Sequence, residues 1–161
     1  RPENALLGVM YVADKDVVYG GYDFVISNSA DPYYANTGLQ NGDRLPLLVG
    51  FEWDGVINNG QSPNGLVVLS QSPFPAEQQP PSATDADLPA GTDPLVSNAV
   101  RYTAASGAKV FATGSIQWMW GLDSADVPTA REDPRAKQIA VNVLADMGAR
   151  PLTPTGNVIV P

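Results

Sequence analysis

The chain has 161 residues, of which 43% are hydrophobic and 16% charged, as is typical of one globular domain or domain fragment. Its net charge is −8 and its nine Lys and Arg residues are scattered, which excludes a nucleic-acid-binding face and disfavours an anionic membrane surface. It contains neither Cys nor His, which excludes disulfides, cysteine nucleophiles, Cys-based zinc sites and Ser-His-Asp triads.

Two segments near the N-terminus are predicted strands. Residues 5–12 (ALLGVMYV) form an unbroken apolar run, which is typical of a central strand covered on both faces. Residues 22–27 follow the Gly20-Gly21 pair and form a second strand. The opening RPEN does not resemble a natural start, so we expect a fragment or a processed chain.

Residues 29–44 are rich in turn signals and are predicted to form a loop. Tyr33 and Tyr34 lie within it. They are able to form a platform on which a ligand stacks, but the simpler interpretation is that they pack against their own domain.

Residues 45–54 (LPLLVGFEWD) predict an apolar strand whose far end carries two carboxylates around a tryptophan. In an extended strand, Glu52 and Asp54 point to the same side. Such a pair is suited to bind a cation or to divide acid and base roles, whereas the simpler interpretation is a solvated strand end with Trp53 in the core. Residues 66–69 return after an Asn- and Gly-rich turn and are predicted to pair with this strand.

Residues 72–94 contain six prolines and almost no large apolar side chains, so they are not expected to pack as a regular element. We expect a flexible, disordered loop there, with a lid over the Glu52 end of the preceding strand as the alternative. Beyond this loop, residues 97–104 and 108–112 predict a hairpin joined by a short Gly-containing turn.

Residues 107–122 (GAKVFATGSIQWMWGL) hold two of the three tryptophans, and the fold is predicted to be organised around them. Residues 108–112 form a short buried strand. Every second residue from Ile116 to Trp120 is large and apolar, which predicts a further extended stretch with Trp118 and Trp120 on one face. This stretch either seals the core or lines a pocket, and we favour sealing.

Residues 133–148 predict the one convincing helix. Asp133 supplies the N-cap, Pro134 the first helical position and Gly148 the C-terminal stop. The apolar residues recur at the spacing of a single buried stripe, while the polar residues of the first turn and a half face outward. The stripe consists of Ala136, Ile139, Ala140, Val143, Leu144 and Met147, and the outward residues are Arg135, Lys137 and Gln138. The acidic residues of 123–133 lack the spacing of a calcium loop, so we expect no metal there.

These elements predict an α/β fold in which a β-rich mixed sheet packs with one dominant C-terminal helix. The candidate site lies where the two motifs stand at strand ends. It consists of Glu52, Trp53, Asp54, Gln117, Trp118, Trp120 and Asp123. We expect Trp118→Ala to destabilise the fold by roughly 3–5 kcal/mol and Trp53→Ala to do so less severely.

Four segments in this order resemble the C-terminal part of the N,N-dimethylformamidase large-subunit family: RPENALLGVMYV, LPLLVGFEWD, GAKVFATGSIQWMWGLD and DPRAKQIAVNVLADMGARP. The resemblance covers about residues 1–151 and leaves the Pro-rich segment unmatched. It implies the second half of a class I glutamine-amidotransferase-like, flavodoxin-like domain. Such domains also occur in exported multidomain proteins, so the resemblance favours an extracellular or cell-surface location.

The resemblance also limits the expected chemistry. Amidotransferases of this class use a Cys nucleophile with a His and a Glu, and residues 117–120 stand where their His-Pro-Glu turn is expected. The dimethylformamidase family uses iron held by tyrosines and a glutamate, which the resemblance places upstream of the matched region. We therefore expect no metal or cofactor in this chain and iron only in a full-length parent.

The expected function is that of a non-catalytic domain fragment whose partner is the upstream half of the same parent domain. If the parent is an enzyme, the resemblance implies hydrolysis of a carbon–nitrogen amide bond. The alternative is a structural or binding module of an exported multidomain protein. Neither nucleic acid nor a membrane is expected as a partner.

Overall fold

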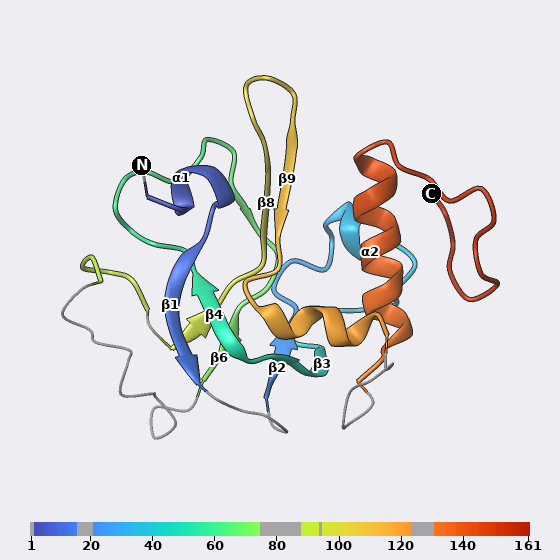
Figure 1. Ribbon diagram of the computed structural model, residues 1–161, viewed down its shortest axis with the longest axis horizontal. Coiled ribbons are helices and arrows are strands. Elements are labelled where there is room, and N and C mark those ends of the chain that lie inside the picture. The colour runs from blue at the N-terminus through green and yellow to red at the C-terminus, as the bar shows by residue number, and fades with distance from the viewer. Residues whose placement is uncertain (1, 16–20, 75–87, 94, 124–130) are drawn as a thin grey trace.

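The computed structural model describes residues 2–15, 21–74, 88–93, 95–123 and 131–161. Its helices are α1 (Asn4–Leu7) and α2 (Pro134–Asp146), with 3-10 turns at η1 (Pro32–Tyr34) and η3 (Ile116–Gly121). Its strands are β1 (Met10–Lys15), β2 (Tyr22–Val25), β3 (Arg44–Val49), β4 (Phe51–Gly55), β5 (Val67–Val68), β6 (Ser72–Pro73), β7 (Val96–Ser97), β8 (Val100–Thr103) and β9 (Lys109–Ala112). β1 and β4 lie on one side of the molecule, α2 lies on the other, and the β8–β9 hairpin rises between them (Figure 1).

The strands form small separate sheets. β1 pairs with β4, β2 with β3 and β6 with β7, while β8 lies between β5 and β9. A β-rich fold with one main C-terminal helix is therefore confirmed, but the predicted mixed sheet is wrong, because every strand pair in the described ranges is antiparallel. Pro and Gly residues interrupt the strands at short intervals, which keeps each sheet narrow.

The first predicted strand, residues 5–12, is in fact a helical turn followed by a strand. α1 ends at Leu7 with Gly8 as its C-cap, and β1 begins only at Met10, where it pairs with β4. Leu6 and Leu7 are exposed on α1 rather than buried in a sheet. A short apolar run does not by itself distinguish a buried strand from a helical turn, which is why the prediction failed.

The predicted strand over residues 45–54 is divided in two. Gly50 separates β3 from β4, and Phe51 lies in the left-handed region with φ 59°. β3 pairs with β2 and β4 pairs with β1, so one stretch of sequence serves two sheets. The returning residues 66–69 contain β5, which pairs with β8 and not with the preceding strand as predicted.

Two further predictions are confirmed in part, and a third is contradicted at its described start. Residues 22–27 contain β2, and the predicted hairpin is formed by β8 and β9, although β9 is half-buried rather than buried. At the start of the Pro-rich segment, β6 pairs with β7 and Phe74 is buried, so these residues are not part of a flexible loop. Residues 75–87 and 94 of that segment lie outside the described residues.

Tyr33 and Tyr34 belong to the core. Both side chains are buried. The Tyr33 hydroxyl donates a hydrogen bond to Asp146 of α2 at 2.9 Å, and the Tyr34 hydroxyl donates to the Leu69 carbonyl at 2.8 Å. The packing interpretation is confirmed, and these rings offer no exposed stacking platform.

The Trp-containing segment is a 3-10 turn and not the predicted extended stretch. Ser115 caps this turn, because its Oγ accepts a hydrogen bond from the Gln117 N–H at 3.3 Å. Residues three apart share a face of such a turn, so Ile116 and Met119 are exposed together while Trp118 points inward. Trp118 is 4% exposed and seals the core, as predicted.

α2 begins and ends where the sequence predicts. The Asp133 carboxylate accepts a hydrogen bond from the Arg135 N–H at 2.8 Å, and Pro134 occupies the first helical position. Gly148 follows the helix with φ 87°, a conformation that glycine adopts without strain. No helix within the described ranges is long and apolar enough to cross a membrane.

The apolar stripe of α2 is shorter than predicted. Leu144 and Met147 are exposed, so the buried stripe ends at Val143. Gln138, which was predicted to face outward, is buried instead, because its amide bonds the carbonyl and the N–H of Ile159 at 2.6 and 2.8 Å. Helical periodicity does not reveal a side chain that pairs with the backbone of a later segment.

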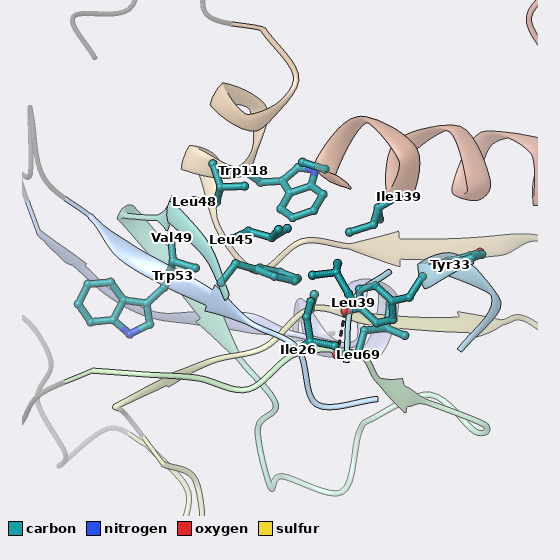
Figure 2. Packing of buried hydrophobic residues seen from close by; sticks show 14 of the residues in the cluster. Ile26, Tyr33, Leu39, Leu45, Leu48, Val49, Trp53, Leu69, Trp118 and Ile139 are labelled. Atoms are coloured by element: carbon teal, nitrogen blue, oxygen red, sulfur yellow. Dashed lines mark hydrogen bonds between the residues drawn. The ribbon is translucent and has the colours of Figure 1, made fainter. Parts of the chain in front are cut away.

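The core is one cluster to which most elements contribute. In Figure 2, Trp118 of η3 lies beside Leu45 and Leu48 of β3, and Ile139 of α2 points toward the same layer. The Trp118 ring also packs against Phe24 of β2, with ring centres 4.8 Å apart. α2 therefore covers a core whose other walls are β2, β3 and η3.

Candidate functional site

An open groove lies between α1, β4, β9 and η3. Its volume is about 440 Å³, and two carboxylates and several apolar side chains line it. The carboxylates are Glu52 and Asp54, and the large apolar side chains are Leu7, Phe111, Ile116 and Met119. We call it the carboxylate groove. It is the candidate site because the predicted carboxylate pair and a concave surface coincide there.

β4 positions the two carboxylates because both of its edges are fixed. One edge pairs with β1. On the other edge, the Asp54 N–H donates to the Gly114 carbonyl at 2.9 Å, and the Asp54 carbonyl accepts from the Asn98 N–H at 3.0 Å. Alternation along the strand puts Trp53 in the core and both carboxylates at the groove, as the sequence predicts.

The two carboxyl groups interact with each other. Burial raises the pKa of Asp54 to about 6, and the charges of Glu52 and Glu3 and a hydrogen bond with Glu52 act in the same direction. Asp54 therefore keeps its proton to a higher pH than an exposed aspartate does. The pair is therefore suited to hold a basic group, or to retain a proton close to neutral pH.

Exposed apolar side chains form the walls of the carboxylate groove. Ile116 and Met119 of η3 are 52% and 63% exposed, and Leu7 of α1 is also exposed. Phe111 of β9 is held in place by Tyr33, whose ring meets it edge-on at 5.7 Å. The groove thus combines apolar area with negative charge, a combination typical of a binding surface.

Three of the predicted site residues lie in the interior. Trp53 is 0% exposed and stacks on Phe74, with ring centres 4.2 Å apart. Gln117 is buried as well, and its Nε2 donates to a backbone carbonyl of β3 at 2.7 Å. Together with Trp118, these residues hold η3 and β4 against the core and do not line the groove.

Trp120 and Asp123 also lie outside the carboxylate groove. The half-buried Trp120 ring meets Phe51 edge-on at 5.3 Å, and the Arg131 guanidinium lies over it at 4.4 Å. Asp123 is exposed shortly after η3. Of the predicted candidates, only Glu52 and Asp54 are brought together at the groove.

Sequence reasoning missed the apolar walls, which are Leu7, Ile116 and Met119. An extended reading of residues 116–120 places Ile116 beside Trp118 and therefore inside the protein. The available signal was Ser115, because a capping residue followed by apolar residues three apart is typical of a helical turn.

A second hollow is a weaker candidate for a site. A hollow of about 560 Å³ lies near β6 and β7, but Asp93 is the only carboxylate among its described lining residues. The Asn98 amide in that hollow is already bonded to the Ser70 carbonyl at 3.1 Å and to the Val56 N–H at 3.0 Å. Within the described ranges, no group of three or more Asp, Glu, His or Cys residues is placed to hold a metal.

The model of the family described as N,N-dimethylformamidase beta subunit-like, C-terminal, matches residues 1–133. This match includes every residue of the carboxylate groove and ends immediately before α2, so the helix included in the sequence resemblance lies outside it. No curated protein matches the chain. The match supports the dimethylformamidase part of the resemblance but not the glutamine-amidotransferase-like description. Because it covers most of the sequence, the chain belongs to the N,N-dimethylformamidase beta subunit-like C-terminal family.

Proposed function

We propose that this domain is a non-catalytic docking module, which packs through its carboxylate groove on the upstream part of a larger dimethylformamidase-like subunit. The observation that carries this proposal is the set of exposed apolar side chains at the groove, Leu7, Ile116 and Met119. The family description, which makes this a C-terminal domain, supplies the partner.

The apolar walls favour an interface. The outer face of a turn that serves only the core is usually polar, whereas η3 presents Ile116 and Met119 to solvent. Apolar side chains gathered on a surface are unfavourable in water and are typical of contact surfaces. Methionine in particular adapts its shape to an irregular partner.

The position of α1 favours the upstream part of the parent as the occupant. In a subunit that carries this domain at its C-terminal end, the chain arrives from the N-terminal side of the domain. α1 is the first element of the given sequence, and its last residue, Leu7, lines the groove. A preceding part of the parent therefore enters close to the groove, where the covalent link gives it a high effective concentration.

A catalytic role is the alternative. Amide hydrolysis with Glu52 and Asp54 as acid and base also requires a nucleophile and donors for the developing negative charge. Both hydroxyls on the groove lining are engaged with backbone groups: Ser115 Oγ donates to the Gly50 carbonyl at 3.0 Å, and Thr113 Oγ1 donates to the Ser115 carbonyl at 3.1 Å. We therefore place the chemistry of an enzymatic parent in its upstream part.

The finer relation to an amidotransferase-like, flavodoxin-like domain belongs to the same proposal. A late strand, a turn and a helix follow one another as β9, η3 and α2, and this order supports the relation. The antiparallel pairing of the described strands speaks against it. A structure of the parent subunit tests the relation, because it requires parallel strands contributed by the upstream part.

The chain offers an internal test of docking, because two methionines are exposed in different places. Met119 lies at the groove, and Met147 lies at the end of α2 with 41% exposure. Mild hydrogen peroxide should oxidise both to sulfoxide in the isolated domain. In the parent subunit, we expect Met119 to react at least about tenfold more slowly and Met147 to react as before. An unchanged rate at Met119 would overturn the proposal.

A further inference from the structure

We propose that the surface which fills the carboxylate groove presents a Lys or Arg side chain, set among apolar residues, to the Glu52–Asp54 pair. This inference rests on the proposed docking function and defines the chemistry of the occupant. The apolar walls complement the apolar residues of that surface, and the negative carboxylates complement its positive charge.

Among the residues whose side chains the structure describes, none supplies a counter-charge to the carboxylate pair. None of the ion pairs between described residues uses Glu52 or Asp54. The charged group that acts on Asp54 from outside β4 is Glu3, just before α1, which is acidic as well. Lys109 of β9 is engaged elsewhere, with Asp146 of α2. The described lining of the groove is therefore negative, with no cation of its own.

A purely apolar occupant would leave this charge without compensation. Covering the groove removes both carboxylates from water, and an unpaired charge buried at an interface is strongly unfavourable. One basic side chain offsets much of this penalty, because it sets a positive charge directly against the two carboxylates. An Arg guanidinium contacts both groups through its planar fork, and a Lys ammonium does so as a point charge.

Proton linkage distinguishes a basic occupant from an apolar one. A cation at the pair lowers the pKa of Asp54 below its value of about 6 in the free domain, so docking releases a proton. Docking therefore becomes stronger as the pH rises from about 5 to about 7. An apolar occupant raises this pKa further, so docking takes up a proton and weakens over the same range. Glu3 and Glu52, the acidic groups that face Asp54, favour the cation in the same way.

The experiment uses the parent subunit, with the rate of Met119 oxidation as the measure of docking. Three forms are compared: the natural sequence, the double variant Glu52→Gln with Asp54→Asn, and Asp123→Asn as a matched control. Asp123 is an exposed carboxylate outside the groove. With a basic occupant, Met119 of the double variant at pH 7 should be oxidised at least about tenfold faster than Met119 of the natural parent subunit. The reason is that the cation of the occupant is left unpaired.

Two further readouts complete the test. The Asp123→Asn control should keep its Met119 protection, and protection of the natural sequence should increase between about pH 5 and pH 7. The pH series needs no substitution, so it stands even if the double variant does not fold. If the double variant keeps its protection, or if protection falls as the pH rises, the occupant is apolar and this inference is wrong while docking stands. If Met119 is unprotected in the natural parent subunit, docking itself is wrong.

Discussion

The side-chain amide of Gln117 lies in the space that a side chain at Gly50 would need. A Cβ atom at Gly50 would lie 2.8 Å from Gln117 Cδ, and a Cβ atom at Gly21 would also press on this amide. The amide is held by its hydrogen bond to the Leu47 carbonyl at 2.7 Å. Gly21, just before β2, and Gly50, between β3 and β4, therefore form the slot that receives η3.

Replacing Gly50 by Ala should destabilise the domain by about 1–3 kcal/mol, because the buried amide has no room to move. In a Gln117→Ala background the same substitution should cost clearly less, since the new methyl group enters the vacated space. Gly156→Ala is the matched control: its surroundings are open, and the change should stay within about 0.5 kcal/mol. Urea melts measure the free energy of unfolding of all the variants. If the losses caused by the substitutions at positions 50 and 117 simply add, the Gln117 amide does not fill the space beside Gly50.

Trp53→Ala and Trp118→Ala should each lower the free energy of unfolding by about 3–5 kcal/mol, because both indoles are buried. The sequence ranks Trp53 as the milder substitution, but its complete burial and its stack on Phe74 correct that order. Trp120→Ala should cost less than either, because Trp120 is only half-buried. Denaturant melts measure the three variants, and a Trp118→Ala protein that melts like the natural one would show that this residue does not seal the core.

The charge of Asp54 should destabilise the isolated domain. The folded-state pKa of about 6 lies above the unfolded value of about 3.9, so the folded protein binds this proton more tightly. The contribution of Asp54 to stability therefore falls as the pH rises from about 4 to about 6 and stays constant above that range. Asp54→Asn should raise the melting temperature more at pH 7 than at pH 4, as scanning calorimetry measures. If the melting temperatures of Asp54→Asn and the natural protein differ by the same amount at both pH values, the pKa of Asp54 is not raised.

Gln138→Ala should release the C-terminal segment from α2. The Gln138 amide bonds both backbone groups of Ile159, so its loss should lower the free energy of unfolding by about 1–2 kcal/mol. Hydrogen exchange measures the local effect, which should be faster exchange at the Ile159 N–H. Lys137→Ala, which removes only an ion pair with Glu132, is the control and should leave that exchange rate unchanged.

The isolated domain should not hydrolyse dimethylformamide, with or without added iron. The chain has no Cys or His, and the described residues contain no set of three converging acidic ligands. Product analysis after incubation with substrate and iron measures this. Iron-dependent turnover that disappears in Glu52→Gln would contradict the prediction and make the carboxylate pair catalytic.

The features that sequence reasoning predicted correctly depend on neighbouring residues. The start of α2 follows from Asp133 and Pro134, and its end follows from Gly148, because capping operates within a few residues. The shared side of Glu52 and Asp54 likewise follows from the alternation of a strand. For the same reason, the β8–β9 hairpin was predicted with its turn.

The features that it missed depend on residues far apart in the chain. β5 pairs with β8 because the core joins these segments, and nothing near β5 in the sequence indicates that partner. Gln138 is buried because Ile159 comes back to it. The site was predicted incompletely for a related reason: Leu7 reaches the groove through tertiary packing, which no local pattern records.

The order of the elements also affects how the protein is made. α2 covers a core whose other walls, β2, β3 and η3, leave the ribosome first. Until residues 134–148 have been synthesised, Leu45, Leu48 and Trp118 belong to an open apolar face, which is prone to aggregation in a nascent chain. A ribosome that pauses over these codons would hold the chain in that state. The family match ends at residue 133, so it leaves out the helix that covers this face.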